Sequence, residues 1–167
     1  QVKSDNGGAY EVSFEIPDHV NGPVEITFGQ SKLAFQVLSS VSLSGPTIVK
    51  YGDTITLNGK GFKVLDTLTV TVGDQEIVFP ANSTVDANGR FTETITIGHS
   101  RWQAKHAIVV TANASGSRIE LTDALTIEPS IVVTPDGGTF NSTVSVEGYN
   151  FSGVGALDDE IVYIDFG

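Results

Sequence analysis

The chain of 167 residues contains no cysteine and no methionine. Without cysteine it can form neither a disulfide framework nor a thiolate site, and the redox compartment is left open. Because even the first residue is not methionine, we expect Gln1 to be a processed terminus or a point within a longer polypeptide. Basic residues are also scarce, since 9 Lys and Arg stand against 20 Asp and Glu and give a formal net charge of −11. Nucleic acids and anionic membrane surfaces attract basic faces, so neither is expected as a partner.

Long apolar runs and helical periodicity are missing as well. No stretch of about 18 apolar residues could cross a membrane as a helix, and no signal segment is recognisable. No membrane segment is therefore expected within this stretch. Instead, short alternating segments recur about every eight to twelve residues, among 18 glycines. This spacing predicts an all-β fold built from β-sandwiches.

A catalytic constellation is not found in the sequence either. The histidines, His19, His99 and His106, are scattered and show none of the paired spacings that metal sites use. No Gly-x-Ser-x-Gly turn presents a nucleophile. We therefore expect that the protein is not an enzyme and has no catalytic residues.

One alternating pattern occurs twice, 89 residues apart. Residues 54–62 read TITLNGKGF and residues 143–151 read TVSVEGYNF, each polar-apolar-polar-apolar and then Gly-x-x-Phe. A proline precedes both copies, Pro46 in the first and Pro135 in the second. The alternation predicts a half-buried strand, and Gly-x-x-Phe predicts a turn closed by an aromatic side chain. A fixed internal period of this size indicates tandem units.

The rear half of the unit is duplicated at the other end of the chain. Residues 86–97 (DANGRFTETITI) match residues 5–16 (DNGGAYEVSFEI), since each has an Asx/Gly turn, an aromatic residue and an alternating strand. Residues 108–112 likewise match 24–28, and residues 124–127 match 34–37. The order along the chain is therefore rear half, whole unit, front half.

This order predicts how the chain divides into domains. Residues 39–128, with about seven expected strands, have the size of a complete immunoglobulin-like sandwich. Residues 1–38 are expected to be the C-terminal half of such a sandwich, with strands at 10–16, 24–28 and 33–38. Residues 129–167 are expected to be the N-terminal half of another, completed by residues 1–38 of the next copy. The residues expected in that shared core are Tyr10, Phe14, Ile26, Phe35, Phe151, Tyr163 and Phe166.

Neither half is expected to be stable in water by itself. Each large apolar side chain left exposed forgoes about 1.5–3 kcal/mol, so several of them match the roughly 5–15 kcal/mol that stabilises a whole domain. Open strand edges also invite pairing with another chain. We expect a copy of the same unit to cover both, as the next repeat of a giant chain or as a separate subunit. The connectors 39–44 and 128–130 are short, which predicts a rod-like array with fixed angles.

Four asparagines stand in Asn-x-Ser/Thr patterns that accept N-linked glycans: Asn82, Asn113, Asn141 and Asn150. Chance alone would supply roughly one or two of them. The first three fall in expected loops, where a glycan has room, whereas Asn150 precedes a core phenylalanine and is the weakest candidate. Glycosylation at these positions requires a surface compartment.

Acidic residues suggest a weak calcium site. Asp158, Asp159 and Glu160 form one acidic run, and their oxygens could gather around Ca²⁺. No Asp-x-Asp-x-Asp-Gly loop is present, so a solvated acidic loop is the preferred interpretation and no cofactor is expected.

The single tryptophan, Trp102, lies in an expected loop with His99 and Arg101. It is a candidate ligand contact, because an indole ring can stack on a sugar. A contact between units, or a lid over the end of its own sandwich, explains it equally well.

The two segments that run from Pro46 to Phe62 and from Pro135 to Phe151 resemble the opening of IPT/TIG-like immunoglobulin repeats. The turn and strand at 86–91 resemble a second hallmark of similar repeats in archaeal and bacterial cell-surface proteins. The resemblance covers nearly the whole chain and rests on turn glycines and alternation. It implies immunoglobulin-like sandwiches in stalks, S-layer components, adhesins or extracellular filaments. The chain departs from the pattern in its long 152–160 loop and in a shortened strand after Gly167.

Two functions are favoured by the sequence, and a third, an auxiliary domain of a secreted enzyme, ranks below them. The first is a structural repeat unit of an extracellular filament, stalk or surface layer, whose copies join head-to-tail or follow one another in a giant chain. The second is an adhesin or carbohydrate-binding module of a secreted or surface protein. Both functions place the chain at the cell surface or outside the cell.

Overall fold

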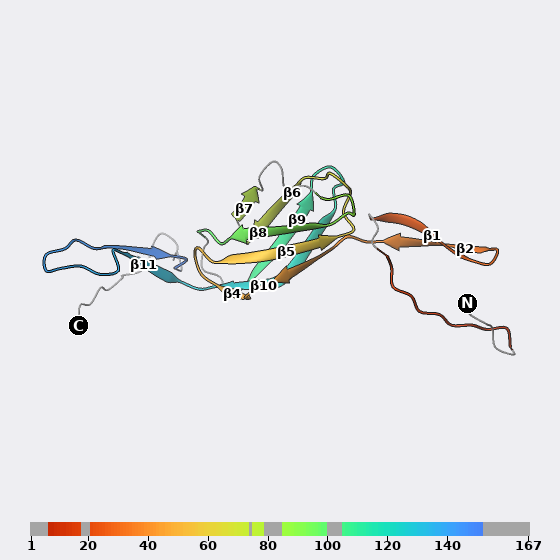
Figure 1. The fold of residues 1–167 in the computed structure, drawn as a ribbon, viewed down its shortest axis with the longest axis horizontal. Coiled ribbons are helices and arrows are strands. Elements are labelled where there is room, and N and C mark those ends of the chain that lie inside the picture. The colour runs from red at the N-terminus through yellow and green to blue at the C-terminus, as the bar shows by residue number, and fades with distance from the viewer. Residues whose placement is uncertain (1–6, 18–20, 74, 79–84, 100–104, 152–167) are drawn as a thin grey trace, which may run out of the picture.

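The computed structural model describes residues 7–17, 21–73, 75–78, 85–99 and 105–151. All regular structure in these ranges is β, which confirms the expected all-β class. An N-terminal hairpin, a central unit of two sheets and a C-terminal hairpin follow one another along one long axis (Figure 1). No helix in the described ranges has the length and apolar character needed to cross a membrane.

The strands of the described ranges are β1 (Gly22–Phe28), β2 (Ser31–Val37), β3 (Ser40–Ser44), β4 (Ile48–Val49), β5 (Thr54–Lys60), β6 (Leu68–Val72), β7 (Gln75–Val78), β8 (Phe91–Thr96), β9 (His106–Ala112), β10 (Arg118–Ile127), β11 (Ser130–Thr134) and β12 (Ser145–Tyr149). The N-terminal hairpin is β1-β2 and the C-terminal hairpin is β11-β12, each antiparallel.

The central unit is a sandwich of two sheets, ordered β3-β5-β8 and β4-β10-β9-β6-β7. β3 lies antiparallel to β5, whereas β4 pairs in parallel with β10, so the chain changes sheet between Ser44 and Ile48. Gly45 lies at this change of sheet with a φ of 115°, which favours glycine. The first edge strand thereby contributes to both sheets.

The structure corrects one expectation about the central unit, because most of the segment expected to be a connector (39–44) is strand β3. Its hydroxyls and apolar side chains alternate: Ser40, Ser42 and Ser44 are exposed, while Val41 and Leu43 are half-buried against the core. The period-2 pattern of a strand was therefore present but was masked by the polar composition.

The core of the sandwich is formed by alternate residues of both sheets. The apolar residues buried together are Val49, Ile55, Leu57, Phe62, Leu68, Val70, Val72, Val85, Phe91, Ile95, Ile97, Ile108, Val110, Ala112, Leu125 and Ile127. The rings of Phe62 and Phe91 meet edge to face, with centroids 5.1 Å apart. Gly59 lies directly under the Phe91 ring, since a Cβ atom there would stand 1.9 Å from Cε1 of Phe91. The strand therefore requires glycine at this position.

A buried carboxylate fixes the loop between β9 and β10. Asp66 accepts hydrogen bonds from the backbone amides of Ala114 (2.7 Å) and Ser115 (3.0 Å). Burial by itself raises the pKa of Asp66, but these hydrogen bonds to the ionised form outweigh it, and the pKa lies below the usual 3.8.

We expect Asp66→Ala to destabilise the sandwich by about 1–3 kcal/mol, because the backbone amides of Ala114 and Ser115 lose a charged acceptor. Because the folded-state pKa is lowered, the stabilisation is fully present above pH 3.8 and is lost as the pH falls through the folded-state value. Urea unfolding of both proteins at neutral and acidic pH measures this difference, and Asp136→Ala, at an exposed carboxyl between β11 and β12, is the control. An equal loss of stability at every pH would contradict the assignment.

Residues 9–17 differ from the expectation as well, since they run extended but join no sheet, although the alternation predicts a strand at 10–16. Tyr10 of this segment stacks on Phe28 of β1, with ring centroids 5.2 Å apart. A strand forms only where an edge offers hydrogen-bond partners. In the described part of the chain no such edge is paired with this segment.

The repeat supplies a matched pair of substitutions for core packing. Leu57→Ala removes a fully buried side chain of β5 and is expected to lower the free energy of unfolding by about 2–5 kcal/mol. Val146→Ala changes the corresponding residue of β12, which is exposed, and should cost under about 1 kcal/mol in dilute solution. Denaturant unfolding at low protein concentration measures both. Equal losses would show that the two positions are not packed differently.

Candidate functional site

The C-terminal hairpin repeats the first hairpin of the central sandwich with the same pairing. In the sandwich, β3 meets β5 with Ser40 opposite Lys60 and Ser44 opposite Thr56. In the hairpin, β11 meets β12 with Ser130 opposite Tyr149 and Thr134 opposite Ser145. Each pairing has five rungs. Lys60 maps onto Tyr149 at the repeat offset of 89 residues, whereas Ser40 maps onto Ser130 at 90, so β11 is shifted by one residue relative to the repeat. The internal repeat is thus present in the backbone as well as in the sequence.

The turns at the two ends of these strands also agree. Gly52 before β5 has a φ of 86°, and Asn141 at the equivalent place before β12 has a φ of 68°. Gly61 after β5 has a φ of 74°, and Asn150 after β12 has a φ of 61°. Asparagine tolerates the left-handed region better than other residues that carry a Cβ atom. The second copy therefore keeps the same turns with a different residue.

The two copies differ in what covers the far edge of the second strand. In the sandwich, β5 is paired on one side with β3 and on the other with β8. Among the described residues, β12 is paired with β11 alone. Within the part of the chain that the structure describes, one edge of β12 is therefore open, and open edges readily accept another strand.

Exposure shows the same difference. Leu57 of β5 is 0% exposed, whereas its counterpart Val146 of β12 is 39% exposed. Ile95 and Phe91 of β8 are 2% and 5% exposed, whereas their counterparts Phe14 and Tyr10 are 57% and 54% exposed. The repeat counterparts of core residues of the central unit are thus exposed to solvent at both ends of the chain.

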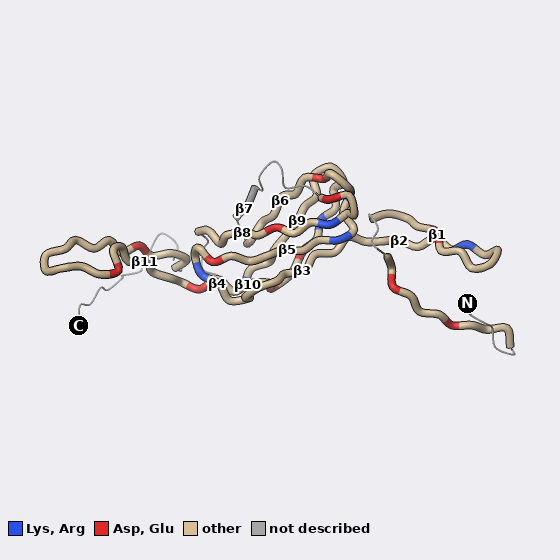
Figure 2. The backbone as a smooth tube through the Cα atoms, in the orientation of Figure 1, with Lys and Arg blue, Asp and Glu red and all other residues tan. Residues whose placement is uncertain are grey.

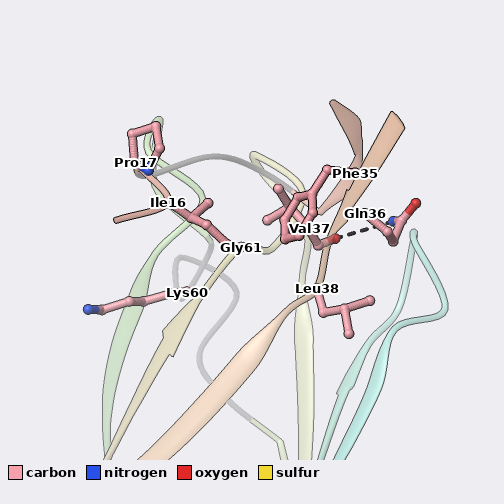
Figure 3. A pocket seen from close by; sticks show the side chains of 8 residues that line it. All are labelled: Ile16, Pro17, Phe35, Gln36, Val37, Leu38, Lys60 and Gly61. Atoms are coloured by element: carbon pink, nitrogen blue, oxygen red, sulfur yellow. Dashed lines mark hydrogen bonds between the residues drawn. The ribbon is translucent and has the colours of Figure 1, made fainter. Parts of the chain in front are cut away.

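An apolar trough lies between residues 14–17 and the β1-β2 hairpin. The residues that line it are Phe14, Ile16, Pro17, Val24, Glu25, Ile26, Phe35 and Val37, around a volume of about 360 Å³. A second cavity of about 330 Å³ shares Ile16, Pro17, Phe35 and Val37 and reaches the central unit at Lys60 and Gly61 (Figure 3). The residues that line the trough are mostly apolar, as in one half of a sandwich core.

Hydrogen bonds hold the base of the β1-β2 hairpin on the central sandwich. The backbone amide of Asn21 donates to the Gly61 carbonyl (2.7 Å), and its side chain donates to Ser117 Oγ (2.8 Å). The Ser39 hydroxyl donates to the same Gly61 carbonyl (2.8 Å). This joint is polar and lies at one end of the central unit (Figure 1).

An aromatic cluster forms the joint at the opposite end. Tyr51 and Tyr149 stack almost parallel, with ring centroids 3.7 Å apart, and His99 lies 4.9 Å from each. Tyr51 and His99 belong to loops of the sandwich, and Tyr149 ends β12. No spacing in the sequence predicts this cluster, because the three rings come from separate elements.

Tyr149 also donates a hydrogen bond to a carboxylate oxygen of Glu147. This hydrogen bond, together with partial desolvation and the negative charge of the carboxylate, raises the pKa of Tyr149 to about 12. The Tyr149 phenol therefore stays protonated at any physiological pH.

The acidic charge is carried by the ends as well as by the centre. Residues 129–167 contain no Lys or Arg, and neither do residues 7–17. Figure 2 shows acidic positions along both of these segments, whereas lysine and arginine occur in the central unit and the β1-β2 hairpin. A contact between residues 7–17 and residues 129–167 would therefore contain no ion pair from lysine or arginine.

The expected shared-core residues are placed in part. Tyr10 and Phe14 are exposed, while Ile26, Phe35 and Phe151 are half-buried. Tyr163 and Phe166 lie outside the described residues, as do Asp158, Asp159 and Glu160, Trp102, Arg101 and Asn82. No group of three or more metal-ligating side chains occurs in the described ranges.

The remaining sequons differ in accessibility. Asn113 and Asn141 are exposed in turns, as expected for a glycan acceptor. The Asn113 amide donates to the Thr67 hydroxyl (3.2 Å), a hydrogen bond that a glycan would replace. Asn150 is 5% exposed, so in this conformation its amide has little room for a glycan.

Comparison of the chain with family models, with curated proteins and with solved structures finds no match. The internal repeat and the surfaces that the two ends present are therefore the features of the molecule that indicate its function.

The raised pKa of Tyr149 at the C-terminal joint can be tested by spectroscopy. Glu147→Gln should lower the pKa of Tyr149 toward 10.0, because the phenol loses the bond to a charged acceptor. Ultraviolet absorbance of the phenolate during a pH titration measures this, and the signal lost in Tyr149→Phe assigns it. Glu128→Gln serves as the control and should leave the curve unchanged. Superposable curves for Glu147→Gln and the unaltered chain would contradict the assignment.

Proposed function

We propose that this chain is a structural repeat unit of an extracellular filament, stalk or surface layer. Copies join head-to-tail: the C-terminal hairpin of one copy and the N-terminal half of the next complete one immunoglobulin-like sandwich. The copies are either separate subunits or successive repeats of a giant chain, and the contact is the same in both cases. The single observation that carries the proposal is the open edge of β12, whose equivalent in the central unit is covered by β8.

The immunoglobulin-like character is supported by the strand order of the central unit. A three-stranded sheet faces a larger sheet, and the first edge strand is divided between the two. Such antiparallel sandwiches of about seven to nine strands are the usual architecture of immunoglobulin-like domains. The relation to IPT/TIG-like repeats of cell-surface proteins is part of the proposal and rests on the turn and strand patterns described above.

The complementarity of the two ends supports joining between copies. One end presents two paired strands, β11 and β12, and the other presents an apolar trough and an extended segment, residues 10–17, that belongs to no described sheet. Neither end duplicates the other, so a contact between them is heterologous. Heterologous contacts that do not close into a ring generate open filaments. The linear arrangement of the chain favours the open form (Figure 1).

The alternative, an adhesin or carbohydrate-binding module, has less support. It requires a loop tip with His99 available beside Trp102, but His99 packs against Tyr51 and Tyr149 at a joint. A glycan array distinguishes the two: binding that is lost in Trp102→Ala would favour the module.

Assembly itself can be measured by sedimentation velocity over a range of concentrations and by electron microscopy. We expect the chain to form linear oligomers, and Val146→Asp to remain monomeric because it places a charge in the shared core. Ile48→Asp is the matched control, since Ile48 is also an exposed apolar residue but lies on β4. A chain that stays monomeric at every concentration would contradict the proposal. The mass of denatured native material separates subunits from a giant chain.

A further inference from the structure

We propose that residues 10–16 of one copy add as an antiparallel strand to the open edge of β12 of the preceding copy, in one fixed register. In this register Tyr10 lies opposite Gly148 and Phe14 lies opposite Val144. The inference rests on the proposed head-to-tail joining and specifies its chemistry. The partner is a second copy of this chain, which contributes residues 10–16 to the contact.

The central sandwich supplies the template for this register. There β5 and β8 pair with Gly59 opposite Phe91 and Ile55 opposite Ile95. The repeat that aligns β5 with β12 carries Gly59 onto Gly148, and the repeat that aligns 86–97 with 5–16 carries Phe91 onto Tyr10. A slip by one residue would turn every apolar side chain of the added strand to solvent.

In the proposed register the Tyr10 ring packs over the Cα atom of Gly148, and this position is called the seat of the ring. In the template, the Phe91 ring covers Gly59 so closely that no Cβ atom could be accommodated. In the open hairpin a Cβ atom on Gly148 would stand 3.0 Å from Cε2 of Phe151, so the Phe151 ring now covers this glycine. When Tyr10 takes the seat, Phe151 is left beside it, as Phe62 stands edge to face with Phe91 in the template. Aromatic side chains across from strand glycines stabilise sheets in this way.

The two faces of the added strand suit their surroundings. Toward the core it brings Tyr10, Val12, Phe14 and Ile16, all at least one-third exposed in the isolated chain. These side chains and those of β12 would fill the trough against the β1-β2 hairpin. Toward solvent it places Ser13 opposite Ser145, where the template has Thr94 opposite Thr56 with hydroxyl oxygens 3.4 Å apart. Glu11 opposite Glu147 is the one unfavourable rung, because like charges face each other directly.

Disulfide trapping tests the register, since the chain has no cysteine of its own. Copies with Ser145→Cys are mixed with copies carrying Ser13→Cys, Glu11→Cys or Glu15→Cys and oxidised at physiological ionic strength, which screens the acidic rung. Directly opposite residues can form a disulfide, whereas positions two residues away are separated by about 7–8 Å. We expect the Ser13 partner to be trapped at least tenfold faster than the other two. Thr56→Cys with Thr94→Cys in one chain provides the reference for a correctly paired rung.

The outcomes separate the register from the function. Association with faster trapping of the Glu11 or Glu15 partner, or equal trapping of all three, would overturn the register and leave head-to-tail joining intact. Absence of any association in the unaltered chain would overturn both. A second pair of variants avoids oxidation: Gly148→Val should abolish association, whereas Gly137→Val, in open space, should not. Normal association of Gly148→Val would show that the glycine is not the seat of the ring.

Discussion

A strand inside a sheet is under one constraint: it needs a partner at each edge and a cover for its apolar face. β5 meets it completely, because β3 and β8 flank it and its inward side chains are buried. β12 has the same sequence pattern, the same turns and the same first partner, but only half of the surroundings. The unmet half is balanced at the other end of the chain by residues 9–17, which have the pattern of a strand and no sheet.

Much of the fold could be predicted from the internal repeat, because strand alternation and turn glycines are local properties. The strands of the central unit and of both hairpins lie close to their expected positions. β3 was missed because its alternation is carried mostly by serine, and residues 10–16 form no strand because pairing depends on an edge that is not local. The Tyr51–Tyr149 stack and the Asp66 cap arise where separate loops meet, so no period in the sequence encodes them.

The two joints show how one chain holds three bodies in line. At one end, Asn21 and Ser39 bind the Gly61 carbonyl, which is a directional polar contact. At the other end, flat rings stack, which fixes the distance between the parts more strongly than their rotation. Gly61 follows the last residue of β5 and Tyr149 is the last residue of β12, so the two contacts lie one position apart in the repeat. The ends of these strands thus position the neighbouring unit as well as close their own sheet.

The division of the first edge strand has a mechanical consequence. The chain enters the central unit at β3 and leaves it after β10, at opposite ends of the long axis (Figure 1). β4 and β10 run parallel. Two backbone hydrogen bonds of 2.8 Å join them, from the Thr126 amide to the Thr47 carbonyl and from the Glu128 amide to the Val49 carbonyl. Tension on the two ends draws these strands past each other, so the bonds are loaded in shear and must rupture together. A sandwich joined in this way resists stretching at the very place where the chain leaves it.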